Sequence, residues 1–581
     1  MNHPAVRPMD PASVFREMVA QGDLVLDRFD ACIGTHPDKI FLYYGEDDVR
    51  LSFAAFGRDV DALAAGLVAL GVQPGDRVSV MTRNSLIATL AMFAAWRAGA
   101  VYAPVNFNYT GRLLSYQLND TAPRVLVVDP ACAASVAGVL GEITVPSFVL
   151  HRPRPGAHDF DPAAEIRLPV ARTIELADLL RTPGTAPRVP RGYADLANII
   201  YTSGTTGPAK GVLQGFRWIN QYTYLMRALN GPDDVIYCDL PLYHVGGAFF
   251  LIARACWNGN TVSLWDRFSP TRFWDRIVAT RATTAVLVDV MTPWLMSAEP
   301  RASDRANTLN KVHMQPLPLA HHEVAQRFGI DFMTCGYGQT EAGLGFAALI
   351  DELGEQMGTP AELWRGPGKA AVRDAALRLG MPVVSGAEPV AKGYMGLPSP
   401  LLEPSVLDPD DNEVPPGGVG QLAFRPRFPS LILEAYFNKP DVTQRTFRNC
   451  WFHTGDAVYK GIDSNWYFVD RMGGFFRVRG ENVSSYQVED LLNAHPKIRA
   501  TAAIPIPATV GDEEDVAVFI QLIDGHAMTE AELRDFAADV MPKYMQPKHV
   551  RFTDELPLTP SSKIEKYKLK QQLLAELGRS A

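Results

Sequence analysis

The sequence lacks the features that mark several large classes of protein. Its 581 residues include only six cysteines, which form no CxxC pair and show no Cys/His spacing of a zinc site. Reduced thiols are therefore expected rather than a disulfide framework. The most apolar long stretch, residues 86–104, is interrupted by Arg97 and is too short to cross a bilayer. Because the first 15 residues contain no apolar signal segment either, we predict a cytoplasmic protein without a membrane span.

An excess of basic residues is also missing. The chain has 55 Lys and Arg against 64 Asp and Glu, a formal net charge of −9, which argues against a nucleic-acid-binding protein. Binding of an anionic nucleotide would then depend on local dipoles and a few placed cations. Hydrophobic residues at 47% and charged residues at 20% match ordinary globular proteins and exclude a largely disordered chain.

The order of predicted elements indicates parallel sheets covered by helices. Apolar residues recur at helical spacing in residues 53–70, and this segment ends at Gly71, where glycine favours a helix C-terminus. Further strands and helices then alternate, with strands at 77–81, 101–104 and 125–128 and helices at 86–98 and 113–118. Strand–helix–strand units joined by short glycine-marked turns are typical of α/β domains.

Two irregular stretches interrupt this alternation. Residues 152–191 are rich in Pro, Gly and Ala, and we interpret them as a surface excursion. Residues 351–392 hold one helical segment, 369–378, between Gly/Pro-rich flanks. Connections of this length either carry function or are tolerated insertions.

The pattern changes near residues 469–480, where Gly473 and Gly474 interrupt a strand. Beyond them the sequence predicts helices at 486–493 and 530–540 and strands at 502–506 and 516–522. These elements are enough for a separate α+β domain of about 110 residues. We therefore divide the chain into residues 1–472 and residues 473–581, with the glycine pair as a low-barrier pivot between the two domains.

Residues 199–212 carry the most informative pattern, because an apolar strand runs into a loop of hydroxyl groups and glycines that ends near Lys210. The loop residues are Thr202, Ser203, Gly204, Thr205, Thr206 and Gly207. Gly-rich loops after a strand turn backbone N–H groups inward and form a concave site for phosphate. The Gly-Lys-Ser/Thr ending of a Walker A loop is missing. The alternative is a flexible surface loop, which this density of hydroxyls, glycines and a lysine disfavours.

The loop resembles the phosphate-loop signature of the adenylate-forming superfamily, which comprises acyl-CoA synthetases, luciferases and peptide-synthetase adenylation domains. Further segments resemble the family's motifs in the family's order, at residues 336–341, 451–456, 470–471 with 479–482, and 556–563. Among the branches of this superfamily, the sequence of these segments is most similar to the acyl-CoA ligases, and among those to carnitine/crotonobetaine-type CoA ligases. This resemblance implies a large N-terminal domain of parallel-rich sheets covered by helices and a small mobile α+β C-terminal domain.

The resemblance also implies a reaction in which a carboxylate attacks the α-phosphate of ATP, pyrophosphate leaves, and the CoA thiol then attacks the acyl adenylate. Two anions must approach each other, so Mg²⁺ and placed cations have to neutralise the phosphates. Thr205 and Glu341 are the expected Mg²⁺ ligands, and the alternative is that Thr340 and Glu341 form a helix N-cap pair. Lys563 is expected to bridge the carboxylate and the α-phosphate, with an ordinary solvated lysine in a Lys-rich tail as the alternative.

The same resemblance assigns residues to the nucleotide and to CoA. Asp456 is expected to accept hydrogen bonds from the ribose hydroxyls, and the alternative is a turn aspartate. Arg471 is expected to contact ribose or phosphate, and the alternative is an exposed ion pair with Asp470. The full set expected to bind ATP, Mg²⁺ and CoA is Thr202, Ser203, Gly204, Thr205, Thr206, Gly207, Lys210, Gln315, Tyr337, Gly338, Gln339, Thr340, Asp456, Arg471, Arg479, Gly480 and Glu481.

The second half reaction in this family follows a swing of the C-terminal domain that opens a thiol tunnel. Arg479, Gly480 and Glu481 stand in the segment that resembles the tunnel wall, where a glycine permits close approach of the pantetheine arm. His244 resembles the histidine that gates the acid pocket, and we count it with Glu341 and Lys563 as a candidate catalytic residue. The alternative for His244 is a satisfied core histidine.

The acid pocket is expected to be lined from residues 237–250, 285–296 and 334–343, with apolar and aromatic groups suited to a compact organic acid. Its candidate residues are Tyr243, His244, Phe249, Asp289, Met291, Trp294 and Tyr337. Asp289 stands in an apolar strand, where a carboxylate is costly to bury unless it is paired. We hypothesise that it recognises an amine, a quaternary ammonium or a hydroxyl group. The alternative is a strand-end aspartate bonded to neighbouring backbone.

Some positions depart from the family pattern. Residues 315–317, Gln-Pro-Leu, replace a glycine-containing turn expected against adenine. Gly473 replaces a charged pivot residue, and Ser562 stands where a glycine precedes the catalytic lysine. The stretch 351–392 is longer than its family counterpart, and we expect it to lie over the mouth of the active site.

We therefore predict an ATP-dependent carboxylic acid–CoA ligase that releases AMP and pyrophosphate. Its partners are a small-molecule carboxylic acid and CoA as acyl acceptor, with no nucleic acid, and a homodimer is left open. One alternative is an adenylating enzyme that loads a carrier-protein thiol. Another is a catalytically silent acyl- or nucleotide-binding relative. Pyrophosphate release separates the silent relative from the two enzymes, and the thiol that is required separates the enzymes from each other.

Overall fold

The structure is a computed structural model of the chain, and it describes residues 8–164, 166–181, 188–202, 209–288, 291–472, 475–511, 513–557 and 564–579. The predicted pivot glycines, Gly473 and Gly474, lie outside these ranges. Within the described ranges, no helix combines the length and the apolar character needed to cross a membrane.

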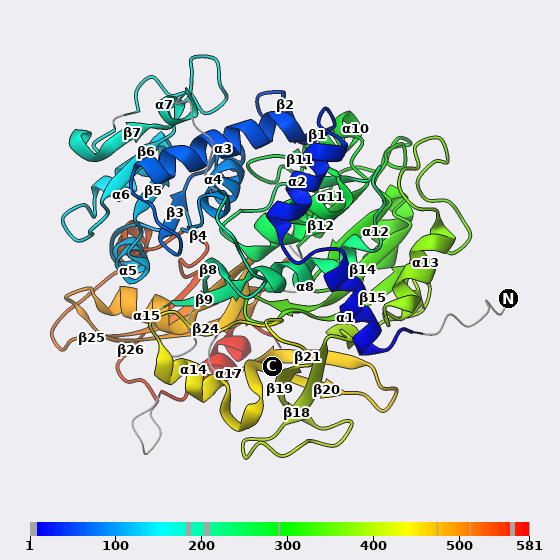
Figure 1. The fold of residues 1–581 in the computed structure, drawn as a ribbon. Coiled ribbons are helices and arrows are strands. Elements are labelled where there is room, and N and C mark those ends of the chain that lie inside the picture. The colour runs from blue at the N-terminus through cyan, green and yellow to red at the C-terminus, as the bar shows by residue number, and fades with distance from the viewer. Residues whose placement is uncertain are drawn as a thin grey trace.

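Strand–helix–strand repeats in the first third of the chain build a seven-stranded sheet (Figure 1). Its strands, in spatial order, are β7 (Thr173–Glu175), β6 (Ser147–Leu150), β5 (Val125–Val128), β3 (Arg77–Met81), β4 (Val101–Pro104), β8 (Leu196–Thr202) and β9 (Lys210–Gly215). All neighbours are parallel except β8 and β9, which are antiparallel. The covering helices are α3 (Phe53–Ala69), α4 (Ser85–Arg97), α5 (Gly111–Thr121), α6 (Pro130–Ala137) and α7 (Leu176–Arg181).

Helices cover both faces of this sheet because its strands are apolar on both faces. In β5, Val125 and Val127 belong to the core that contains α3 and α4. Leu126 and Val128 belong to a separate core with α5 and α6. A continuous apolar strand of this kind is typical of a parallel sheet buried on both sides.

A second, 14-stranded sheet is built mostly from the middle of the chain and is completed by two strands near its beginning. Its strands are β18 (Leu402–Leu407), β19 (Val419–Pro426), β20 (Phe452–Lys460), β21 (Trp466–Arg471), β17 (Tyr394–Pro398), β15 (Gly343–Asp351), β14 (Phe332–Gln339), β13 (Lys311–Met314), β12 (Thr284–Leu287), β10 (Val235–Cys238), β11 (Thr261–Leu264), β1 (Ile40–Tyr44) and β2 (Val49–Ser52), with β16 (Val383–Ser385) paired to β15. Pairing is parallel from β14 to β1 and antiparallel from β14 to β18. The predicted parallel-rich α/β class is therefore confirmed, with an antiparallel half in addition.

Helix α8 (Phe216–Arg227) lies between the two large sheets, and all its residues are buried (Figure 1). The other helices of this part are α1 (Pro11–Ala20), α2 (Val25–Thr35), α9 (Ala255–Asn258), α10 (Phe273–Thr280), α11 (Met291–Met296), α12 (His321–Phe328), α13 (Lys369–Arg378) and α14 (Pro440–Thr446). A π-helix, η2 (Gly246–Ala253), follows β10, and short 3₁₀ turns occur at η1 (Val170–Arg172) and η3 (Arg448–Cys450). One hydrophobic core joins residues of both large sheets.

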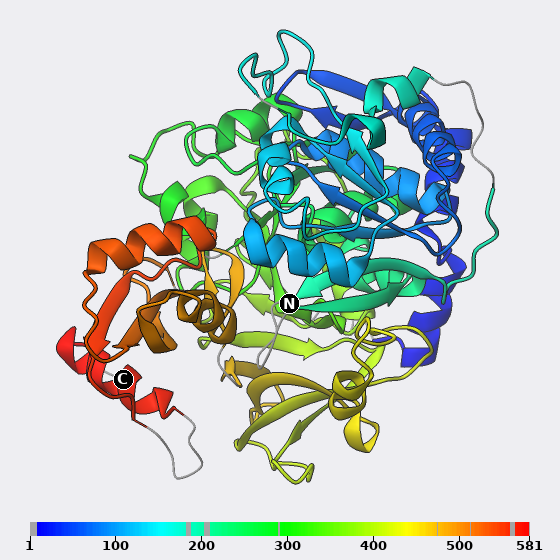
Figure 2. The ribbon, with the colours of Figure 1, turned by 90° about the vertical axis from the view of Figure 1, so that its left-hand side faces the viewer.

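The C-terminal residues form a small α+β unit with its own core, as predicted. Its elements are β22 (Phe475–Val478), β23 (Glu481–Ser484), α15 (Ser485–Asn493), β24 (Ile498–Pro507), β25 (Glu514–Leu522), α16 (Glu530–Val540), β26 (His549–Thr553) and α17 (Lys566–Glu576). Apolar residues on one face of the β24–β25–β26 sheet pack against α15 and α16, and those on the other face pack against α17. Figure 2 shows these elements, orange to red, grouped at one side of the molecule.

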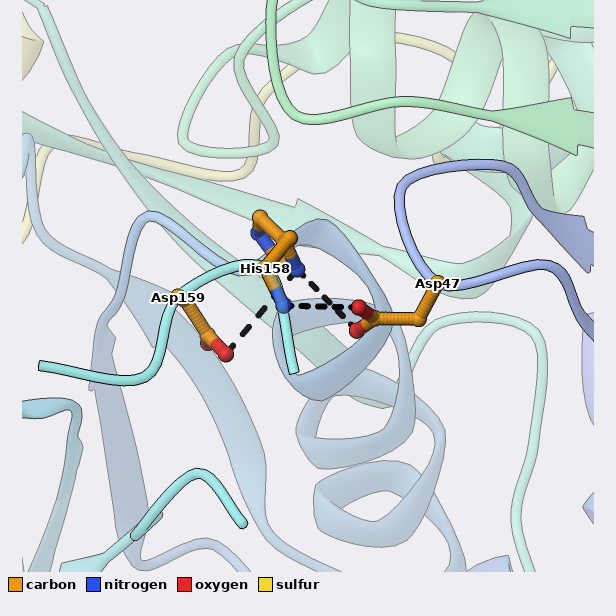
Figure 3. Close-up of side chains that lie close together, drawn as sticks. All are labelled: Asp47, His158 and Asp159. Atoms are coloured by element: carbon orange, nitrogen blue, oxygen red, sulfur yellow. Dashed lines mark hydrogen bonds and ion pairs between the residues drawn. The ribbon is translucent and has the colours of Figure 1, made fainter. Parts of the chain in front are cut away.

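The stretch 152–191 is attached to the body of the protein by charged side chains (Figure 3). His158 Nδ1 lies 3.0 Å from Asp47 Oδ2, and His158 Nε2 lies 2.8 Å from Asp266 Oδ2. Asp159 is a further carboxylate beside the ring. The hydrogen bond to Asp266, against the effect of burial and with help from Asp47, raises the pKa of His158 to about 9. The prediction of a plain surface excursion is incomplete, because β7 adds an edge strand parallel to β6.

Candidate functional site

A cavity of about 490 Å³ opens where the large sheets meet the β22–β23 hairpin. Most of the predicted site residues that the structure describes line it. They are Thr202, Lys210, His244, Gln315, Gly338, Gln339, Thr340, Glu341, Asp456, Arg479, Gly480 and Glu481. Ser203, Gly204, Thr205, Thr206, Gly207, Asp289 and Lys563 lie outside the described residues.

The two ends of the predicted phosphate loop are held together by strand pairing. Thr202, the last residue of β8, is the register partner of Lys210, the first residue of β9. The Lys210 Nζ lies 4.5 Å from the centroid of the Tyr436 ring. Burial lowers the pKa of Lys210, and the charge of Glu341 opposes that shift. The hairpin therefore presents a cation next to a carboxylate at the point where the predicted phosphate loop begins and ends.

Glu341 lies in the turn between β14 and β15, so the alternative of a helix N-cap pair with Thr340 is wrong. Its Oε1 accepts hydrogen bonds from Tyr436 Oη at 3.0 Å and Thr202 Oγ1 at 3.4 Å. Its Oε2 makes no hydrogen bond to any residue in the described part of the chain. A carboxylate oxygen left open to the cavity beside a threonine hydroxyl is a donor set that suits Mg²⁺, so the residues present fit this ion.

Asp456 is buried in β20 and lines the same cavity as Glu341. Tyr337 Oη donates a hydrogen bond to Asp456 Oδ2 at 2.5 Å, and Gln339 Nε2 donates to the same oxygen at 3.3 Å. The backbone N–H of Asp456 bonds to Thr454 Oγ1 at 3.1 Å. Asp456 is thus a strand residue with an oriented carboxylate, not merely an aspartate in a turn. Arg471 is its register partner on β21.

The β22–β23 hairpin brings the C-terminal unit to the cavity. Its turn consists of Arg479 and Gly480, which have positive φ values of 52° and 83°. The Gly480 N–H donates to Glu513 Oε2 at 2.9 Å, which holds the turn. Because the left-handed region favours glycine, Gly480 is suited to this tight reversal at the cavity wall.

Glu481, the residue after this turn, connects the C-terminal unit to the rest of the chain. Its Oε1 accepts a hydrogen bond from Tyr243 Oη at 2.7 Å, and its Oε2 lies 2.8 Å from His244 Nε2. Burial acts to raise the pKa of Glu481, but the charge of His244 and the two hydrogen bonds prevail and lower it. The His244 side chain is 38% exposed, so the alternative of a core histidine is wrong. Tyr243 reaches the site through its hydroxyl, although its ring does not line the cavity.

Comparison with known proteins decides the family. The model of the AMP-binding enzyme family matches residues 29–431, and that of the AMP-binding enzyme C-terminal domain matches residues 487–563. This chain belongs to the AMP-binding enzyme family. The AMP-binding enzymes adenylate their substrates, so the predicted adenylate-forming superfamily is confirmed.

Curated and solved AMP-binding enzymes extend over nearly the whole chain. A crotonobetaine/carnitine–CoA ligase of Salmonella arizonae is 26% identical over 563 residues, which is 95% of this chain and 100% of that protein. An o-succinylbenzoate CoA synthetase of Bacillus subtilis, bound with a product analogue, has a TM-score of 0.73 at 20% identity, covering 94% of this chain and 98% of its own. The amide bond synthetase McbA of Marinactinospora thermotolerans has a TM-score of 0.72 at 22% identity, covering 94% and 99%. At these identities the two structures show a shared fold.

Several expectations for this AMP-binding enzyme are corrected by the structure. Trp294 is 43% exposed and stacks on Phe268, away from the cavity. Phe249 is buried in the core, and its neighbour Phe250 lines the cavity instead, because the π-helix turns that residue inward. None of the described residues 351–392 lines the cavity, so that stretch does not cover its mouth. Met291 lines the cavity as expected, and Gln315 bonds to Gly338 O at 3.3 Å.

Sequence reasoning missed several polar residues of the cavity, among them Tyr222 on α8, His313 on β13 and Arg477 on β22. His313 had a usable signal, because it interrupts the apolar Val312 and Met314 at a strand end and so faces the opposite side. Burial lowers the pKa of His313 to about 4, so the ring is neutral. Tyr222 gave no such signal, since an aromatic residue on a buried helix is ordinarily part of the core.

Proposed function

We propose that this AMP-binding enzyme is a carboxylic acid–CoA ligase that uses ATP and releases AMP and pyrophosphate. A carboxylate oxygen of the acid attacks the α-phosphorus of ATP, the bond to pyrophosphate breaks, and an acyl adenylate forms. The sulfur of CoA then attacks the acyl carbon, and AMP leaves as the carbon–oxygen bond breaks. The domain boundary belongs to this proposal and lies between residues 472 and 473, so that the C-terminal unit turns between the two steps.

The first step needs positive charge around the phosphates. Lys210 would supply one fixed cation, and Lys563 would supply a second from its loop. Bound Mg²⁺ would add charge at the phosphate oxygens, held by Glu341 through the free oxygen described above and by Thr205. Asp456, oriented by Tyr337, would accept hydrogen bonds from the ribose hydroxyls, with Arg471 beside it on the neighbouring strand.

The second step needs an approach path for a thiol. Gly480 has no side chain, and it lies at the cavity wall in the hairpin that Glu481 fastens to His244. In this arrangement the turn Arg479–Gly480 would border the pantetheine arm, and His244 would gate the acid pocket. A carrier-protein thiol would enter by the same path, which keeps that acceptor as the competing possibility.

The observation that carries the proposal is the convergence of Lys210, Glu341 and Asp456 on one cavity. They come from β9, the β14–β15 turn and β20, segments that are far apart in the sequence. A cation, an open carboxylate oxygen and a second oriented carboxylate are the groups that a Mg–nucleotide requires. A protein that had lost the chemistry would have no need to retain all three.

The test is pyrophosphate release from ATP and Mg²⁺ with a panel of carboxylic acids, with and without CoA. We expect one class of acid to give CoA-dependent turnover and Lys563→Ala to reduce it by about a thousandfold, the scale of a lost transition-state contact. Lys570→Ala, at a half-buried lysine of α17, is the matched control and should behave like the unchanged protein. Turnover without CoA that appears on addition of a carrier protein would replace the CoA ligase by the carrier-loading enzyme. Absence of pyrophosphate with every acid would refute both.

A further inference from the structure

The π-helix next to His244 carries a charged residue that the proposed reaction does not use. Gly246 and Phe250 of this helix line the cavity, and Arg254 follows Phe250 by about one turn. The Arg254 N–H bonds to Phe249 O at 3.0 Å, the wide i→i−5 spacing of a π-helix. Arg254 therefore lies on the same helix face as Gly246 and Phe250. It does not line the cavity itself but lies behind its closed end, by which we mean the buried wall formed by Tyr222, Phe250 and His313.

Arg254 is buried without a partner. It is 3% exposed, and its guanidinium makes no hydrogen bond or ion pair with any residue in the described ranges. Asp234 is the acidic group that acts on it most strongly. That carboxylate is already bonded to Lys311 Nζ at 2.9 Å and to Thr283 Oγ1 at 2.6 Å. Burial lowers the pKa of Arg254 to about 10, so the group stays charged at neutral pH.

A second buried arginine, in contrast, has the hydrogen-bond partners that a structural arginine needs. Arg227 on α8 is also buried, and its guanidinium donates to the side chains of Gln21, Asn220 and Thr223. An unpaired buried charge is costly, and proteins supply a counter-ion or hydrogen bonds where the group is structural. Arg254 lacks both, which points to a partner that comes from outside the chain.

The surroundings of Arg254 indicate where that partner binds. One aromatic ring, that of Phe250, contacts the Arg254 guanidinium at 5.1 Å, the His313 ring at 4.9 Å and the Tyr222 ring at 5.3 Å. Tyr222 and His313 line the cavity, and the hydroxyl of Tyr222 makes no hydrogen bond to a described residue. Arg477 lines the same cavity from the hairpin. This end of the cavity therefore combines a free hydroxyl donor with the unpaired guanidinium of Arg254 behind the Phe250 ring.

The charge of Arg477 is paired with Glu513, whose Oε1 lies 3.3 Å from Arg477 Nε, whereas no described carboxylate bonds to Arg254. The carboxylates that line the cavity within the described ranges are Glu341, Asp456 and Glu481, and each is held elsewhere by the hydrogen bonds given above. In a dry, apolar wall a charge is screened far less than in water. The closed end should thus favour an anionic group of the substrate and disfavour a cationic one.

We propose that the closed end of the cavity binds a second carboxylate, so that this enzyme acts on dicarboxylic acids. The inference rests on the proposed function, because one carboxylate has to be activated by ATP while the other meets Tyr222 and the field of Arg254. A betaine-type acid, with a quaternary ammonium group in that place, would meet the positive field of Arg254 and be disfavoured. Arg254 is a specificity-determining residue in this scheme.

The experiment compares each dicarboxylic acid with the monocarboxylic acid of the same skeleton, using adipic with hexanoic acid and isophthalic with benzoic acid. The measured quantity is kcat/KM for CoA-dependent pyrophosphate release by the full-length protein. We expect the unchanged protein to prefer the diacid of at least one pair by about tenfold or more, the ratio that about 1.4 kcal/mol of added binding gives. Arg254→Met should abolish the preference by lowering the diacid value alone, and Arg254→Lys should restore part of it.

Arg58→Met, on the exposed side of α3, is the control for loss of one positive charge and should leave the ratio unchanged. If Arg254→Met lowers both acids of a pair alike, the residue is structural and the inference is overturned while the ligase stands. If the unchanged protein prefers the monoacids or treats both acids equally, the inference is overturned in the same way. Absence of pyrophosphate with every acid would instead refute the proposed function, and the inference with it.

Discussion

Glu481 joins the C-terminal hairpin to the acid side of the cavity, and replacing it tests what that contact does. Glu481→Gln keeps the size of the side chain and removes its charge. In the structure the carboxylate is only 14% exposed, and it is bonded to Tyr243 at 2.7 Å and to His244 at 2.8 Å. We expect the substitution to weaken the arrangement in which the hairpin borders the cavity.

The size of the effect follows from the bonds that change. A hydrogen bond to a charged group contributes about 1.5–3 kcal/mol. The amide oxygen of Gln can still accept from Tyr243, so the contact with His244 is the main loss. Because 1.4 kcal/mol is a factor of about ten, the population of the hairpin-docked arrangement should fall about ten- to a hundredfold.

The two half reactions separate this effect from general damage. We expect Glu481→Gln to slow transfer of a preformed acyl adenylate to CoA by about ten- to a hundredfold, and ATP–pyrophosphate exchange to change by less than about threefold. Tyr243→Phe removes one bond and should have the same selectivity with a smaller effect. Glu530→Gln, an exposed carboxylate on α16 that pairs with Arg534, is the matched control.

The pH dependence of this contact has a definite sign. The folded pKa of Glu481 is lowered from its ordinary value of 4.5, so its contribution is present above that value and is lost only as the pH falls through the still lower folded pKa. The advantage of Glu481 over Gln should therefore shrink only as the pH falls below 4.5. Equal slowing of both half reactions, or no slowing of either, would refute the role assigned to Glu481.

Three further predictions concern binding and stability. Tyr337→Phe removes a hydrogen bond to the buried carboxylate of Asp456 and should raise the KM for ATP about tenfold, and an unchanged KM in pyrophosphate-release assays would contradict this. His158→Gln should lower the free energy of unfolding by about 1 kcal/mol at pH 6, a modest loss because the group is partly screened by solvent. Because the folded pKa of about 9 lies above the ordinary 6.5, this loss should vanish as the pH rises through 9. Urea unfolding at pH 6 and at a pH above 9 measures both values. Arg227→Met leaves several buried partners unpaired and should lower the free energy of unfolding by about 3–5 kcal/mol in the same measurement. Arg254→Met should leave the free energy of unfolding unchanged or raise it. Equal losses for the two variants would show that both arginines are structural.

Local signals in the sequence were strong enough to predict many elements. The helix expected at 53–70 is α3 (Phe53–Ala69), and Gly71 after it has the positive φ of 84° that its place predicted. The strands at 77–81, 101–104 and 125–128 and the helix at 530–540 have the predicted bounds. Such elements depend on residues that are neighbours in sequence, namely apolar periodicity, glycine at a helix end and a capping residue.

The candidate site was predictable where it consists of motif residues and not where packing selects a face. Lys210, Glu341 and Asp456 meet in the cavity as their motifs implied. Trp294 turned outward and Phe250 took the place expected of Phe249, because the direction of a side chain depends on the helix that carries it. A π-helix has a wider turn than an α-helix, and the sequence pattern did not predict a π-helix here.

The sequence alone determined the family, the order of the elements and the residue types available for phosphate, ribose and metal, because these are properties of contiguous segments. Tertiary structure alone decided which of these residues meet. Glu481 contacts His244 across 237 positions, and Arg254 is buried beside Phe250 with no partner in the described ranges. Both facts follow from how separate elements pack, and the free energy of a buried charge depends on those distant neighbours and not on the residues next to it in the chain.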